Sequence, residues 1–244
     1  KSFTAKREML NLAMATGDDI IVIDPEAEYK LLIEAIGGEV IRIAAYASIA
    51  MHWMPEILYR FRRVCPNIDV DLRMVDHELE PFELLEKGRT DVIFAAKQAG
   101  FSCDWTPLCQ DAMYAILPPD YPLDGQETFP IEAFEGKEFL MPYGKFDLDV
   151  KAALSANNVK PKIRPCHVDD ETVIRMVGKG LGLSMMAEMM IRGRTNGVTA
   201  VPIEPATGRE LGMGLHMRES MPDGILRLRE CVLAFIGTLP GTES

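Results

Sequence analysis

Residues 40–94 read as two consecutive strand–helix units, and this pattern constrains the fold more than any other part of the chain. Residues 40–45 form a short apolar run, and the segment after them carries apolar residues at helical spacing. A break at Pro66 precedes residues 68–74, where apolar and polar residues alternate as in a strand. A second helix ends in glycine, and residues 91–94 begin a third strand. This order predicts a parallel βαβαβ unit, and such units bind ligands where strands end and helices begin.

Strand and helix patterns also alternate through the rest of the chain, so the predicted class is α/β. Two connections, residues 97–106 and 205–209, are predicted to cross between lobes. A chain that crosses twice between two lobes builds a hinged cleft. Residues 1–43 have a pattern of their own, with two helices and two strands, so residues 40–43 belong to both neighbouring patterns.

Composition narrows the class of protein further. The net charge of −11 argues against a free-standing nucleic-acid-binding protein, because neutralising phosphates needs clustered Lys and Arg. The five cysteines are odd in number and form no C-x-x-C pair, so neither a disulfide framework nor a zinc site is predicted. The sequence has no 18-residue apolar run and no signal-peptide pattern, which predicts a cytoplasmic chain without a membrane partner. The chain begins at Lys1 rather than Met, which leaves the true upstream sequence open.

Residues 40–240 resemble the effector-binding domain of LysR-type transcriptional regulators, which is similar to the two-lobed periplasmic binding proteins. Each matching segment alone is weak, but their combination and order are specific. The segments are RIAAYASIAMHWMPEIL, FRRVCPNIDVDL and LLEKGRTDVIF, followed by AILPPDYPL at residues 115–123 and VGKGLGLS at residues 177–184.

The resemblance implies a two-lobed, periplasmic-binding-protein-like (type 2) fold with a short N-terminal α/β appendage. Lobe one is expected to comprise residues 40–102 plus 207–244, and lobe two residues 103–206. A small organic effector, anionic or zwitterionic, is expected in the cleft, and a homodimer is expected through surfaces of lobe one. Family members carry an N-terminal helix-turn-helix that is not recognisable here, so DNA contact is expected only through a domain missing from this chain. No cofactor and no enzymatic activity are expected.

The beginning of the chain resembles a different family. Residues 1–43 are similar to the part of conjugative-transfer (type IV secretion) ATPases that follows the phosphate-binding loop, with residues 1–39 as the predicted remnant. On that interpretation Lys1 and Ser2 end a G-x-x-x-x-G-K-S motif whose glycines are not in the chain. Because that loop holds phosphate through consecutive backbone N–H groups, we do not expect ATP hydrolysis. A nucleotide-binding fragment is one alternative function, and a transporter's solute-binding protein is another.

Three groups of ligand-binding candidates come from lobe one. Ser48, with Ala47 before it, lies at a strand-to-helix turn where amides and a hydroxyl attract anions, and the alternative is a plain N-cap. Asp76 and His77 follow a strand end, where an acid favours a ligand with an amine; the alternative is a solvated loop. A third pair, Ala95 and Ala96, either leaves room for ligand or fills space at the end of the next strand.

Lobe two supplies the other candidates. Tyr143 and Gly144 follow a strand and are predicted to face the cleft, with Tyr143 offering a stacking surface and a hydroxyl. Asp169 and Thr172 begin a helix near the second crossing, and the alternative is a capping group that also includes Asp170.

No catalytic or metal-binding pattern is present in the sequence. The four histidines lack the spacing of metal ligands, and no cysteine lies in a nucleophile motif. We interpret Trp53 as a core residue and Met189 and Met190 as core filler, because Met readily fills irregular gaps.

Overall fold

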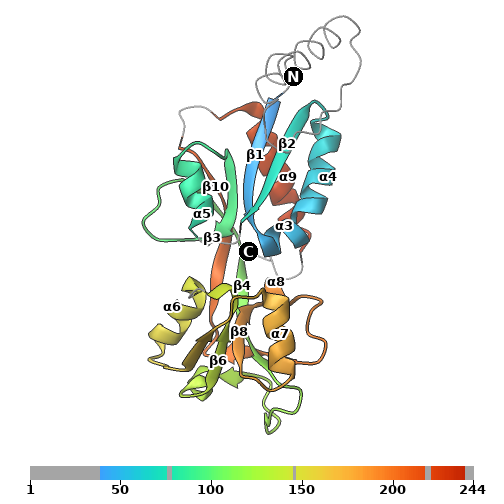
Figure 1. Ribbon diagram of the computed structural model, residues 1–244. Helices are drawn as coiled ribbons and strands as arrows, with labels where there is room; N and C mark the ends of the chain where they lie inside the picture. The colour runs from blue at the N-terminus through green and yellow to red at the C-terminus, as the bar shows by residue number, and fades with distance from the viewer. Residues whose placement is uncertain (1–38, 76–78, 145–146, 218–220, 240–244) are drawn as a thin grey trace, which may run out of the picture.

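The computed structural model describes residues 39–75, 79–144, 147–217 and 221–239. The predicted remnant, except Glu39, and the candidates Asp76 and His77 lie outside the described residues. The described chain forms two lobes stacked end to end and joined by extended strands (Figure 1).

The first lobe contains the parallel unit predicted from residues 40–94. Strand β1 (Glu39–Tyr46) pairs in parallel with β2 (Ile68–Val75) and β3 (Val92–Ala96), which confirms the prediction. Burial follows position in the sheet: every residue of the central strand β3 is buried, whereas the edge strand β2 alternates. The helices of this lobe are α3 (Ala47–His52), α4 (Met54–Val64), α5 (Glu80–Glu86) and α9 (Asp223–Ile236).

Strands β4 (Asp104–Leu117) and β10 (Gly208–Leu215) run from one lobe into the other and pair in antiparallel fashion (Figure 1). The sequence predicted a strand only at residues 113–117, which was too short. Pro107 cannot donate to a ladder, so the segment before it does not resemble a strand. The ladder accommodates Pro107 with a register shift between Leu211 and Gly212 of β10.

The second lobe is a smaller α/β unit. Its remaining strands are β5 (Phe129–Pro130), β6 (Glu138–Met141), β7 (Lys162–Pro165), β8 (Ser184–Ala187) and β9 (Thr199–Glu204). Strands β8 and β9 pair with the far half of β4, and β6 pairs in parallel with β7. Its helical segments are η1 (Ile131–Phe134), η2 (Pro142–Gly144), α6 (Leu148–Ala156), α7 (Asp170–Gly178) and α8 (Glu188–Ile191).

Each lobe has its own hydrophobic core. Along β4, Leu108 belongs to the core of the first lobe and Met113 to that of the second. Strand β4 therefore leaves the first core and enters the second between Leu108 and Met113, several residues after the predicted lobe boundary at residue 103. The lobe boundary itself stays a prediction. Trp53 is fully buried in the first core, as predicted.

Candidate functional site

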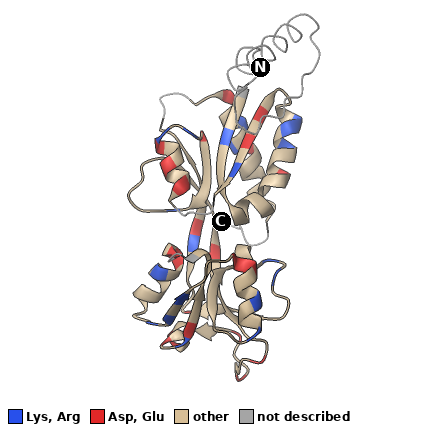
Figure 2. Cartoon of the chain, in the orientation of Figure 1, with Lys and Arg blue, Asp and Glu red and all other residues tan. Residues whose placement is uncertain are grey.

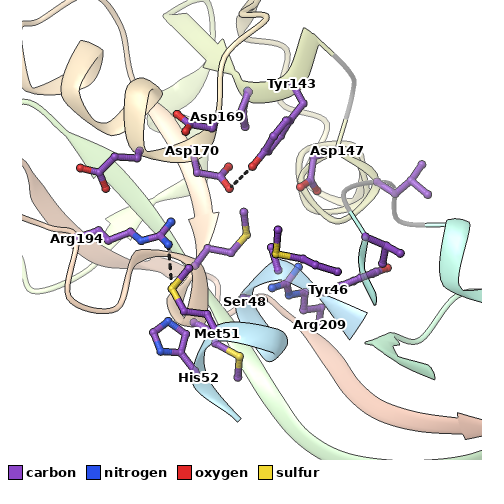
Figure 3. Close-up of a pocket in the computed structure, with 18 of the residues that line it drawn as sticks. Tyr46, Ser48, Met51, His52, Tyr143, Asp147, Asp169, Asp170, Arg194 and Arg209 are labelled. Atoms are coloured by element: carbon purple, nitrogen blue, oxygen red, sulfur yellow. Dashed lines mark hydrogen bonds between the residues drawn. The ribbon is translucent and has the colours of Figure 1, made fainter. Parts of the chain in front are cut away.

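A cavity of about 390 Å³ lies between the lobes and is lined from both of them. Its size falls at the lower end of the range of small-molecule sites, which are usually clefts of roughly 300–1,000 Å³. Lobe one contributes the end of β1, the start of α3 and the end of β2; lobe two contributes η2 and the starts of α6 and α7. Residues around α8, and Arg209 of β10, complete the wall (Figure 3).

The wall from lobe one is built on the turn that joins β1 to α3. Tyr46, Ala47 and Ser48 line the cavity there, and only 9% of Ser48 is exposed. The N-cap of α3 is Tyr46, which makes no side-chain capping bond, so the alternative interpretation of Ser48 as an N-cap is wrong. His52 also lines this wall, and burial together with Arg192 and Arg194 lowers its pKa, which favours the neutral imidazole.

The apolar part of the lining comes mainly from thioether and aliphatic side chains. Met51 and Met74 approach from lobe one, and Met189 and Met190 from the second lobe. Methionine is unbranched and polarisable, so it adapts to ligands of irregular shape. The prediction that Met189 and Met190 are only core filler is therefore too narrow, although Met189 is also packed in the first core.

The wall from lobe two is acidic and starts from two helix caps. Asp147 is the N-cap of α6 and accepts a 2.9 Å hydrogen bond from the Val150 N–H. Asp169 is the N-cap of α7 and accepts a 2.9 Å bond from the N–H of Thr172, which confirms the capping interpretation. Hydrogen bonds from Thr172 lower the pKa of Asp169. Both carboxylates are therefore held at the rim of the cavity by their own helices.

Asp170 is the most deeply buried acid of this wall. Its Oδ2 accepts a 3.3 Å hydrogen bond from the Tyr143 hydroxyl, whereas its Oδ1 is buried without a partner among the described residues (Figure 3). Burial raises the pKa of Asp170 to about 6, although the bond from Tyr143 opposes that rise. Tyr143 has a left-handed backbone with φ of 56°, a conformation that non-glycine residues seldom adopt.

Arg209 is a buried guanidinium at the junction of the two lobes. Its Nε donates to Asp111 Oδ2 at 3.0 Å, and its Nη1 lies 3.5 Å from Asp149 Oδ2 on α6. Its Nη2 is also close to Asp111 Oδ2, at 2.9 Å, but outside hydrogen-bond geometry. Burial acts against the charge of Arg209, but the surrounding aspartates more than compensate and raise its pKa. The guanidinium also lies over the Tyr46 ring, 5.9 Å from its centroid.

Asp111 connects the Arg209 ion pair to helix α8. Its Oδ1 accepts a 3.0 Å hydrogen bond from the Met189 N–H at the start of α8. The Arg209–Asp111 pair thus joins the two connecting strands to α6, α8 and β1. Figure 2 shows acidic and basic segments next to one another on these strands.

Arg194 follows α8 and lines the cavity near the acidic wall. Its Nη2 donates to the thioether sulfur of Met51 at 3.0 Å, a contact between the lobes. In the part of the chain that the structure describes, Arg194 forms no ion pair within 4 Å. Its charge nevertheless contributes to the lowered pKa of Asp169 and opposes the rise in the pKa of Asp170.

The structure brings four of the predicted candidates to one cavity: Ala47 and Ser48 from lobe one, and Tyr143 and Asp169 from lobe two. Thr172 does not line it, because its N–H caps α7. The ligand-binding role of these residues stays a prediction.

Ala95 and Ala96 are not among the lining residues, and their burial agrees with the alternative interpretation that they fill space. Both are buried in β3, where β10 pairs alongside and places Gly212 opposite Ala95. The antiparallel strand β10 therefore extends the sheet beside this part of β3, and the local pattern of residues 91–96 could not reveal it.

Other lining residues were not identified as candidates from the sequence. Arg209 lies in an ordinary alternating strand, and Asp147 and Arg194 lie in polar segments typical of loops. The only available signal was the closeness of Arg209 to the predicted second crossing. Within the described ranges, no group of three or more His, Cys, Asp or Glu side chains could hold a metal ion. None of the helices in those ranges is long and apolar enough to span a membrane.

Comparisons with known proteins agree with the resemblance of the main body. The sequence model of the LysR substrate binding domain matches residues 37–236. The HTH-type transcriptional regulator TtuA of Agrobacterium vitis is 26% identical over 179 residues, which are 70% of this chain and 58% of TtuA. The chain thus spans less than two thirds of the curated relatives it matches.

Solved structures agree on the fold. The CcmR regulatory domain of Synechocystis PCC6803 in complex with 2-PG has a TM-score of 0.72 at 17% identity, and the likeness covers 82% of this chain and 99% of that one. The BenM effector binding domain with its effector benzoate has a TM-score of 0.71 at 20% identity, covering 84% and 96%. The predicted two-lobed, periplasmic-binding-protein-like fold is confirmed.

The comparisons do not support the second resemblance, of residues 1–43 to conjugative-transfer ATPases. The family match begins at residue 37, so it includes residues 40–43, which both sequence patterns share. Neither the nucleotide-binding alternative nor the solute-binding alternative gains support.

Proposed function

The chain belongs to the family of LysR substrate binding domains, and on that premise we propose that its cleft binds a small organic effector, anionic or zwitterionic. The observation that carries the proposal is the cavity of about 390 Å³ lined from both lobes. Ala47 and Ser48 would contact the effector from lobe one, and Tyr143 and Asp169 from lobe two. All four were candidates from the sequence, and they come from segments far apart in the chain.

A ligand in this position would act on the arrangement of the lobes. A molecule that contacts both walls binds more tightly when the walls are close, so it shifts the population toward closed forms. The chain connects the lobes through β4 and β10, where Arg209 and Asp111 meet. Effector binding would be transmitted through this junction to the surfaces of lobe one.

We propose a homodimer that forms through lobe one. Tyr59 and Val64 on α4 are 60% and 59% exposed, and large exposed apolar side chains on one helix favour association. Sedimentation should give twice the mass of the chain. Tyr59→Glu would then shift the protein toward monomer, whereas Leu181→Glu, at an exposed apolar position in lobe two, would not.

In this role the domain senses and does not catalyse, and it would work in the cytoplasm as part of a transcription regulator. The curated relatives are named as HTH-type transcriptional regulators. The net charge of −11 repels DNA phosphates, so a separate domain would contact DNA.

Thermal-shift measurements with amino acids, aromatic acids and dicarboxylates test the proposed function. A compound present at 100 times its dissociation constant should stabilise the protein by about 2.7 kcal/mol. Met190→Trp, which fills the cavity, should abolish the response, whereas Leu181→Trp on the outer surface should keep it. A panel that never moves the melting temperature, or an unchanged response in Met190→Trp, would contradict the proposal.

A further inference from the structure

The charged groups around the cavity are unevenly distributed. Among the residues that the structure describes, four carboxylates line it, against two guanidinium groups, and all four belong to lobe two. One of the guanidinium groups, Arg209, is already paired with Asp111 and Asp149, neither of which lines the cavity. The lining therefore carries an excess of negative charge. The four acids are Asp147, Asp169, Asp170 and Glu171.

The four carboxylates differ in what they already bind. Asp147 and Asp169 accept the backbone N–H groups of their own helices, and Glu171 pairs with Arg175 at 2.7 Å. Asp170 has a single partner, the Tyr143 hydroxyl. Among the acids of this wall, Asp170 is the one with a buried oxygen that has no partner among the described residues.

The carboxylate of Asp170 is buried inside the protein. Only 7% of the residue is exposed, and its Oδ1 has no partner among the described residues. A buried polar atom almost always has a partner, and an unpartnered one calls for a reason such as an absent ligand. The carboxylate lines the cavity and points into it beside Tyr143 (Figure 3). Because the carboxylate that carries this oxygen lines the cavity, a donor on a ligand can bind the carboxylate, and a protonated amine also matches its charge.

A cationic group with spare donors stands on the same wall. The guanidinium of Arg194 has five N–H donors, and its one described partner is the sulfur of Met51, a weak acceptor. Arg194 is close enough to contribute to the lowered pKa of Asp169 and to oppose the rise in the pKa of Asp170. A guanidinium matches the geometry of a carboxylate, which can accept two parallel hydrogen bonds from it.

The rest of the lining is apolar. Met51, Met74, Val75, Leu79 and Met189 supply thioether and aliphatic surface next to these charged groups. Such a surface favours a ligand whose body is compact and apolar.

We infer that the effector is a zwitterion of the amino-acid class with an apolar side chain. Its ammonium group donates to the carboxylate of Asp170, its carboxylate accepts from Arg194, and its side chain packs among the methionines. A simple aromatic or aliphatic acid would leave Asp170 unsatisfied and would add charge beside three further acids. This inference rests on the proposed function and specifies the chemistry of the ligand in the same cavity.

Matched compounds test the inference with the full chain. Leucine, methionine and phenylalanine are each compared with the amine that lacks the carboxylate and the acid that lacks the amine: isoamylamine and 4-methylpentanoate, 3-(methylthio)propylamine and 4-(methylthio)butanoate, phenethylamine and 3-phenylpropanoate. In at least one set, calorimetry should show the amino acid binding tightest. The amine should bind at least tenfold more tightly than the acid. An acid that binds as tightly as its amino acid overturns the inference and leaves the proposed function standing.

Two variants locate the contacts. Asp170→Asn keeps the shape of the side chain and removes its charge, so it should weaken the amino acid and the amine by at least tenfold and leave the acid unchanged. Arg194→Gln should weaken the amino acid and leave the amine unchanged. Glu83→Gln, an exposed acid of α5 that does not line the cavity, is the control for the loss of one charge and should match the wild type.

The outcomes separate the two proposals. If no compound in these sets or in the broader panel of acids binds, both the inference and the proposed function fail. If amino acids bind equally well to the wild type and to Asp170→Asn, the cavity binds effector but the contact with Asp170 is wrong. Circular dichroism of each variant checks that a loss of binding is not a loss of folding.

Discussion

The two lobes line the cavity with opposite chemistry. In lobe one, α3 begins after Tyr46 without a side-chain cap, and the pKa of His52 is lowered. The described lining residues of β1, α3 and β2 carry no carboxylate and no guanidinium group. In lobe two, α6 and α7 both begin at aspartate caps, and Asp170 lies directly beyond one of them. Among the described residues, the carboxylates of the lining thus come from lobe two, whereas β1, α3 and β2 of lobe one provide shape and apolar surface.

The contact between the lobes should be the most sensitive point of this arrangement. Arg209→Met would leave Asp111 and Asp149 buried without their cation, and the free energy of unfolding should fall by about 3–5 kcal/mol. Urea unfolding followed by circular dichroism measures the loss. Arg175→Met removes a guanidinium from an exposed pair on α7 and should change stability by less than about 1 kcal/mol. Similar losses in both variants would show that the buried pair is not a special contact.

The acidic wall should reduce stability at neutral pH. Burial raises the pKa of Asp170 to about 6, so the folded state holds its proton more tightly than the unfolded state does. This contribution to stability is present at pH 4 and is lost as the pH rises through about 6. Asp170→Asn should therefore be more stable than the wild type at pH 7.5, by about 2–3 kcal/mol, and equally stable at pH 4. Thermal unfolding at both pH values measures this, and a variant less stable at pH 7.5 would contradict it.

The affinity for the effector should depend on the protonation of the same carboxyl group, that of Asp170. With an ammonium group bound at Asp170, affinity should fall by about tenfold for each pH unit below 6, because protonation removes the charge that the amine binds. Tyr143, Asp147, Asp169 and Arg194 also act on this carboxyl group. Calorimetry between pH 7.5 and pH 5 tests the expectation. In Asp170→Asn the dependence should disappear, and its persistence there would assign the titration to another group.

The smallest expected effect concerns the caps that distinguish lobe two. Asp147→Ala removes the acceptor for the Val150 N–H and should cost about 1 kcal/mol. Asp147→Asn keeps an N-cap acceptor without the charge and should recover most of the loss. If Asp147→Asn were as unstable as Asp147→Ala, the charge rather than the cap would be the important feature. Urea unfolding of both variants distinguishes the two.

The sequence predicted local features of the site well. The turn at Ala47 and Ser48, the position of Tyr143 after a strand and the cap at Asp169 all follow from neighbouring residues, and all reach the cavity. Arg209 was missed because its importance comes from Asp111, 98 residues earlier in the chain. The two interpretations of Ala95 could not be separated for the same reason, because the strand that pairs beside it lies more than 100 residues later in the chain.

By itself, the sequence determined the α/β class, the parallel unit of the first lobe and the likeness to effector-binding domains. These features depend on the periodicity of apolar residues and on turn residues, which act over short stretches of chain. Only the tertiary structure decided that the second wall of the cleft is acidic, that Asp170 keeps a buried oxygen without a described partner and that Arg209 joins the lobes. Such properties depend on burial and on charges brought together from distant segments, and no local pattern encodes them.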